Sequence, residues 1–165
     1  MGGLQMQRSV TRRCYYFEMH VWSEQQILGF ALTDWLLKAG ASAARKSIAL
    51  GGVEALTPQE RLLYEVWIFD MEQQNGRVSQ YFCNHPIQQW STISGLARPA
   101  LPSFNAFASA VDSVVGQSVD PYESVIDSSV NLDERYYEIR VQLLLELQSL
   151  VQHPLSSSEN SSDDV

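Results

Sequence analysis

The chain has 165 residues, which favours one domain with short extensions. Its hydrophobic fraction of 45% and charged fraction of 18% are enough to build a core and argue against wholesale disorder. Nineteen acids against eleven bases give a net charge of −8, which disfavours direct binding to nucleic acid or to an anionic membrane. Two cysteines are too few for a disulfide framework, and no apolar run approaches the roughly 18 residues that span a bilayer. We therefore expect a cytoplasmic protein.

The charge is distributed unevenly along the chain. Residues 1–50 carry six bases and three acids, whereas residues 51–165 carry five bases and sixteen acids. We divide the chain into a basic N-terminal arm (1–22, with Arg8, Arg12 and Arg13), a single domain (23–154) and a disordered tail rich in serine and acidic residues (155–165). Such asymmetry bears on partners rather than on fold.

The first predicted helix begins at Ser23, where Gln26 completes a capping box. Apolar residues then recur at helical spacing up to Gly40, where we expect this helix to end. An alanine-rich stretch follows and is broken at Gly51–Gly52.

The clearest helix start is Thr57–Pro58–Gln59–Glu60, which combines a capping hydroxyl, a proline at the first helical position and a glutamate at the third. The helix runs through Asp70 to Asn75–Gly76, a pair that tolerates left-handed geometry. We expect Gly76 to have a positive φ and the chain to form a central helical hairpin there.

Two further starts, Asp120–Glu123 and Asn131–Glu134, have the same capping pattern. The last predicted helix spans 132–152, and its apolar face is wider than a surface helix needs, which favours a homodimer. Only Tyr15–His20 alternates enough for a short strand. The prediction is an all-α, compact, multi-helix single domain.

The common enzymatic motifs are absent from the sequence. It has no phosphate-binding glycine loop, no paired histidines at zinc-binding spacing and no serine between elbow glycines, so we expect no metal and no cofactor. Cys83 and His85 are close in sequence, but on a helix they would face different ways. The acids Glu65, Asp70 and Glu72 could do acid–base work, yet nothing in the sequence places a substrate beside them.

Residues 56–84, LTPQERLLYEVWIFDMEQQNGRVSQYFCN, resemble the signature of the DNA mimic protein family. The matching positions include Leu56, Thr57, Pro58, Tyr64, Trp67, Asp70, Glu72, Asn75, Gly76, Gln80, Tyr81, Phe82 and Asn84. The closing helix up to His153–Pro154 is also similar, so the resemblance covers about 56–154. Arg77 and Val78 depart from it, because the family has a second glycine and an aromatic residue at these positions.

The matching residues predict structure more directly than function. If the chain folds back at Asn75–Gly76, the polar side chains of Glu72, Gln80 and Asn84 can hydrogen-bond across the hairpin. This structural role outweighs a catalytic one, because buried polar groups are usually satisfied rather than reactive.

The resemblance implies an all-helical dimer whose carboxylates stand in for DNA phosphates on a basic, DNA-binding partner. Duplex DNA presents about one charge per 1.7 Å, so an acidic array can compete for the same basic groove. The predicted partner-binding residues are Asp112, Asp120, Glu123, Asp127, Asp133, Glu134 and Glu138. The alternative is that these are ordinary solvated carboxylates, and capping by itself explains Asp120, Glu123 and Glu134.

Three functions therefore stay open. The first is a non-enzymatic, DNA-mimic-like protein that binds the basic face of a nucleic-acid-binding protein such as a transcription regulator. The second is an immunity or antitoxin protein that blocks a basic toxin. The third is an enzyme with a polar pocket near Glu72, Gln80 and Asn84, which would need a deep cleft there.

Overall fold

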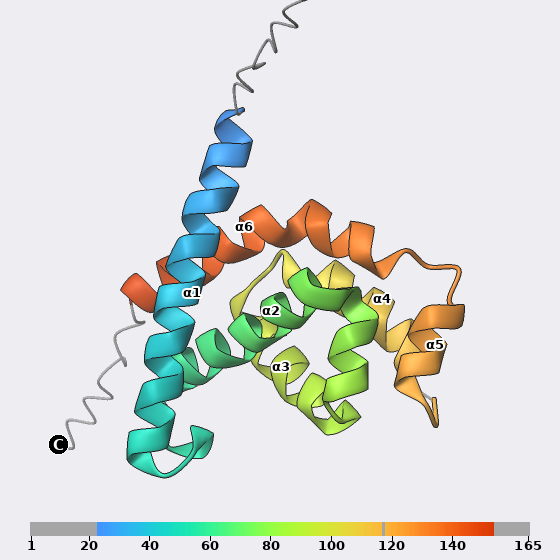
Figure 1. Cartoon of the computed structure of the whole chain (residues 1–165), viewed down its shortest axis with the longest axis horizontal. Coiled ribbons are helices and arrows are strands. Elements are labelled where there is room, and N and C mark those ends of the chain that lie inside the picture. Colours follow the sequence, from blue (N-terminus) through green and yellow to red (C-terminus); the bar gives the residue numbers. More distant parts are fainter. Residues whose placement is uncertain (1–22, 117, 154–165) are drawn as a thin grey trace, which may run out of the picture.

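The computed structural model describes residues 23–116 and 118–153, and in this part of the chain every regular element is helical (Figure 1). The predicted all-α fold is confirmed. The elements are α1 (Glu24–Leu50), the 3₁₀-helix η1 (Val53–Ala55), α2 (Pro58–Asn84), α3 (Ile87–Ala100), α4 (Phe104–Val115), α5 (Pro121–Asp127) and α6 (Leu132–Gln152). The basic arm, the strand expected at Tyr15–His20 and the acidic tail lie outside the described residues.

Four helix starts lie where the capping patterns predict them. Ser23 and Thr57 each form a complete capping box at the start of α1 and α2. Asp120 and Asn131 cap α5 and α6, each accepting a hydrogen bond from the backbone N–H three residues later. A cap satisfies one of the donors that a helix leaves unpaired at its first turn.

The expected end of the first helix at Gly40 is wrong. The helix α1 continues to Leu50 and ends at Gly51, which has φ 88° and caps it in the left-handed conformation. Gly40 has a different role, because a Cβ atom there would lie 2.2 Å from Cγ of Trp67. The missing side chain lets the indole ring of α2 pack directly on the backbone of α1.

The expected hairpin turn is a sharp break inside α2. Gly76 has an extended φ of −158°, so the prediction of a positive φ there is wrong. The next residue, Arg77, has φ 74° and ψ −178°, a combination that is essentially restricted to glycine. Beyond the break the helix resumes, and the backbone N–H of Val78 donates to Oδ1 of Asp133 on α6 (2.9 Å).

The core is an aromatic cluster contributed by α2, α3, α4 and α6. The ring of Phe69 contacts Tyr81 (centroids 4.9 Å apart), Tyr136 (5.2 Å) and Phe107 (5.7 Å). Trp90 lies within contact distance of Phe69 and extends the cluster across α3. The break in α2 lets both of its halves contribute, because Phe69 precedes the break and Tyr81 follows it.

A buried polar network joins three helices beside this core. Arg140 of α6 forms a bidentate pair with Asp70 of α2 (2.6 and 2.9 Å) and donates to Oγ1 of Thr33 on α1 (2.9 Å). The hydroxyl of Tyr136 donates to Oδ1 of Asp70 (2.7 Å). Burial opposes the charge on Arg140, but the hydrogen bond and the charge of Asp70 outweigh it and raise the pKa of the guanidinium.

The wide apolar face of α6 is used inside the monomer. Leu143, Leu144 and Leu147 are buried against the neighbouring helices, and Ile139 and Leu150 pack against the same core. The width of this face therefore gives no support to a homodimer built on α6. No helix in the described part of the chain is long and apolar enough to cross a membrane.

Candidate acidic interface

Exposed carboxylates belong to α5 and to the first turns of α6, and these two segments lie at one end of the molecule (Figure 1). Residues 118–138 contain six acids and a single base, Arg135. We call five of these carboxylates the acidic surface: Asp120, Glu123, Asp127, Glu134 and Glu138, all of which are exposed. Within residues 23–116 and 118–153, no basic side chain lies within ion-pair distance of any of them.

Capping accounts for part of this concentration of charge. One oxygen of Asp120 accepts from the backbone N–H of Glu123 (3.1 Å), and Glu134 accepts from the side chain of Asn131 (3.1 Å). Carboxylates are favoured in the first turn of a helix by its dipole. Asp127 and Glu138 lie at the end of α5 and beyond the first turn of α6, so capping does not explain them.

Asp112 is held within its own chain. Its Oδ1 accepts from Nε1 of Trp90 (2.8 Å), and its Oδ2 pairs with Nη2 of Arg98 (2.5 Å). These contacts join α4 to α3. Because both of its carboxylate oxygens are engaged, we leave Asp112 out of the acidic surface, although the sequence placed it among the partner-binding residues.

The carboxylate oxygens of Asp133 also have partners within the chain, although its neighbour Glu134 is exposed. Its Oδ1 accepts from the N–H of Val78 and from the side-chain amide of Gln73 (3.2 Å), so it caps the second half of α2. Its Oδ2 lies 3.9 Å from Nε of Arg77. This second predicted partner-binding residue therefore stabilises the break in α2, and it too is left out of the acidic surface.

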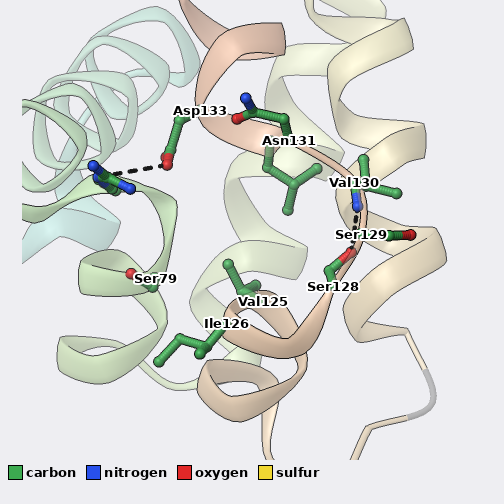
Figure 2. Close-up of a pocket in the computed structure, with 10 residues that line it drawn as sticks. Ser79, Val125, Ile126, Ser128, Ser129, Val130, Asn131 and Asp133 are labelled. Carbon is green, nitrogen blue, oxygen red and sulfur yellow. Dashed lines mark hydrogen bonds and ion pairs between the residues drawn. The ribbon is translucent and has the colours of Figure 1, made fainter.

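An open cavity of about 390 Å³ lies beside Asp133, between α5, the 128–131 connection and the break in α2. Figure 2 shows Ser79 on one side of it and Ile126 and Ser128 on the other. Arg77 also lines this cavity. The cavity adjoins the acidic surface, because residues of α5 contribute to both.

The residues of the family-like motif are mainly structural. Trp67 packs on Gly40, Asp70 is buried against Arg140, and Tyr81 and Phe82 lie in the aromatic core. Asn75 and Gly76 end the first half of α2 at the break. Burial, together with the nearby carboxylates Glu65 and Glu72, raises the pKa of the Tyr81 hydroxyl.

The predicted hydrogen bonds across the two halves of α2 are present in part. Oε2 of Glu72 accepts from Nδ2 of Asn84 (2.9 Å), and Oε1 faces Nε2 of His85 (3.3 Å). Gln80 packs against Gly76 instead, where an added Cβ would lie 2.6 Å from its Oε1. Both oxygens of Glu72 are thus engaged within the chain, which gives this cluster a structural role.

Two arginines were not singled out from the sequence. Arg98 neutralises Asp112 and Arg140 neutralises Asp70, across 14 and 70 residues of chain. Helical spacing could have placed Arg140 on the same face as Tyr136, one turn earlier. No local signal could have shown which acid each arginine meets.

Searches against family models, curated proteins and solved structures each returned no match for this chain. The resemblance to the DNA mimic family therefore rests on the sequence motif alone.

Proposed function

We propose that this protein is a non-enzymatic interaction protein of the DNA-mimic type, which binds the basic face of a nucleic-acid-binding protein through its acidic surface. The observation that carries the proposal is the set of five exposed carboxylates on α5 and α6 without a basic partner in the described part of the chain. Acids elsewhere contrast with them, since Asp34, Glu54, Glu60, Glu65 and Asp70 each pair with a base.

The physical basis is competition for a basic surface. A DNA-binding protein neutralises a regular array of phosphates, about one charge per 1.7 Å of duplex, and gains affinity by releasing counterions. Carboxylates held on rigid helices offer a similar array without base edges. The helices α5 and α6 follow each other in the chain and are capped by Asp120 and Asn131, so the charges are presented by helical backbone.

The test uses the full chain and a defined competition. The full chain is immobilised, and the proteins that it captures from the source cell at low salt are purified. Their binding to a labelled DNA duplex is then followed by fluorescence anisotropy. We expect the chain to displace the duplex, and we expect this effect to weaken steeply as salt is raised, because exposed charges act through screened attraction.

Charge-reversed variants connect this effect to the acidic surface. The triple variant Asp120→Lys, Glu123→Lys, Asp127→Lys should lose the competition while remaining folded, at a cost of about 1 kcal/mol for the lost cap. The single reversals Asp127→Lys and Glu54→Lys are compared, because Glu54 is also exposed but lies on η1, where it pairs with Arg61. Equal loss in both, or full competition by the triple variant, would overturn the proposal.

A further inference from the structure

An apolar groove of about 240 Å³ lies where the start of α2, the end of α3 and the last turns of α6 meet. Leu62 is buried in it, Leu150 is half-buried, and Gly95 and Pro99 are exposed. Among the residues that line the groove, only Gln59 has a polar side chain. Apolar surface of this kind is unfavourable in contact with water, so a group that covers the groove stabilises the fold.

The glycine in this groove has no packing role among the described residues. Gly95 lies inside α3, where glycine destabilises a helix relative to alanine. A Cβ atom added to it would meet nothing within 4 Å. Gly40 is the contrast, because the ring of Trp67 fills the space beside it. The space at Gly95 is thus available to a group from outside the described part of the chain.

The described chain leaves α6 directly beside the groove. Leu150 lines the groove, and the backbone N–H of His153 still donates to the carbonyl of Ser149 (3.0 Å), so the helical course extends to His153. The ψ of His153 is 72°, outside the helical region, as expected for a residue that precedes a proline. On a helix the fourth residue after Leu150 shares its face. The chain therefore leaves α6 on the face that bears Leu150.

The next residues of the sequence supply a group of matching chemistry. Residues 154–165 contain three apolar residues, Pro154, Leu155 and Val165, and otherwise only serine, asparagine and acids. Leu155 is two residues beyond His153, so its Cα lies within about 7 Å of the Cα of that residue. Such a short tether gives Leu155 an effective concentration in the millimolar range, which favours it over an untethered partner.

From the open groove and the point where the chain leaves α6, we propose that Pro154 and Leu155 bind in this groove of their own chain, with the Leu155 side chain against Gly95. The volume is sufficient, because a cavity of about 150 Å³ with an aliphatic lining already holds benzene. The contact links the end of α6 to α2 and α3. It is separate from the proposed function, since the end of α6 and α5 lie on opposite sides of the molecule in Figure 1.

Urea unfolding of the full chain tests the contact. Leu155→Ser should lower the folding equilibrium constant about tenfold, because the burial of a leucine side chain is lost. Val165→Ser is the matched control, since it also replaces an aliphatic residue of the same segment by serine, but far from the end of α6. It should change the constant by less than about twofold.

Filling the groove from α3 connects this loss to Gly95. In Gly95→Leu the new side chain occupies the groove, so adding Leu155→Ser should have no further effect. Gly29→Leu is the matched background, because Gly29 is also a helical glycine with open space around it, but it lies on α1. In that background Leu155→Ser should keep its tenfold effect. Circular dichroism verifies that each variant is folded.

A disulfide distinguishes the same chain from a second copy. In a chain that carries Cys14→Ser and Cys83→Ser, the pair Gly95→Cys and Leu155→Cys should form a bridge in air, which requires Cβ atoms about 3.5–4.5 Å apart. We expect this bridge within one chain, read as a monomer on a non-reducing gel. A bridge between two chains would assign the groove to a second copy and overturn the proposal. A Leu155→Ser variant as stable as the natural sequence would also overturn it and leave the groove to a separate partner.

Discussion

Replacing Arg77 by glycine should stabilise the protein. This residue has φ 74° and ψ −178°, a region in which a side chain clashes with the backbone and which is essentially restricted to glycine. Residues held there cost about 1–3 kcal/mol. Glycine removes this strain, but it adds about 0.5–1 kcal/mol of backbone entropy that folding must overcome. The balance favours Arg77→Gly by up to about 2.5 kcal/mol.

The charge of Arg77 contributes little to this balance. Its guanidinium is 79% exposed and lies 3.9 Å from the carboxylate of Asp133, the limit of an ion pair. Solvent screening leaves such exposed pairs close to zero in stability. Asp133 keeps its stronger contacts to the N–H of Val78 and to Gln73 in the glycine variant, because neither involves the side chain of Arg77.

Urea unfolding followed by circular dichroism measures the effect. Arg77→Ala is the matched control, since it removes the same charge but keeps a Cβ atom and therefore the strain. We expect Arg77→Ala to lie close to the natural sequence and Arg77→Gly to lie above both. If the glycine variant is no more stable than the alanine variant, the backbone at Arg77 is not strained.

Three further predictions concern the packing around α1 and the buried polar network. Gly40→Ala should destabilise the protein by about 1–2 kcal/mol, because the added Cβ meets the ring of Trp67. Gly29→Ala on the same helix has open space around the added Cβ and should stabilise the protein by about 0.5–1 kcal/mol. Equal urea midpoints for the two variants would contradict this packing. Asp70→Asn removes the counter-charge of a buried guanidinium and should cost about 3–5 kcal/mol in urea unfolding, so a loss below 1 kcal/mol would refute the buried pair. Burial and the charge of Asp70 raise the pKa of Tyr136, so the folded state favours the neutral hydroxyl. The free energy of unfolding should therefore fall as pH rises above about 10, where the tyrosine of the unfolded chain ionises. Tyr136→Phe should show a shallower fall between about pH 9 and 11, and an unchanged slope would contradict the assignment.

The starts of the helices could be predicted from the sequence because their causes are local. The caps at Ser23, Thr57, Asp120 and Asn131 each bond within three residues, so the pattern is complete in a short stretch of chain. The all-α class follows from the same patterns. The helices α3 and α4 were not delimited in advance, although Phe104, Phe107, Val111 and Val115 recur at helical spacing and could have been used.

Only the tertiary structure decided the features that depend on groups far apart in the sequence. Gly40 resembles a helix end, but it lies within α1 because Trp67 packs against it from another helix. The break in α2 includes both Gly76 and Arg77, but the positive φ is at Arg77, and Asp133 of α6 accepts from the freed N–H of Val78. The partners of the acidic residues were likewise beyond the sequence, since an ion pair depends on which helices meet and not on the spacing of residues along either one.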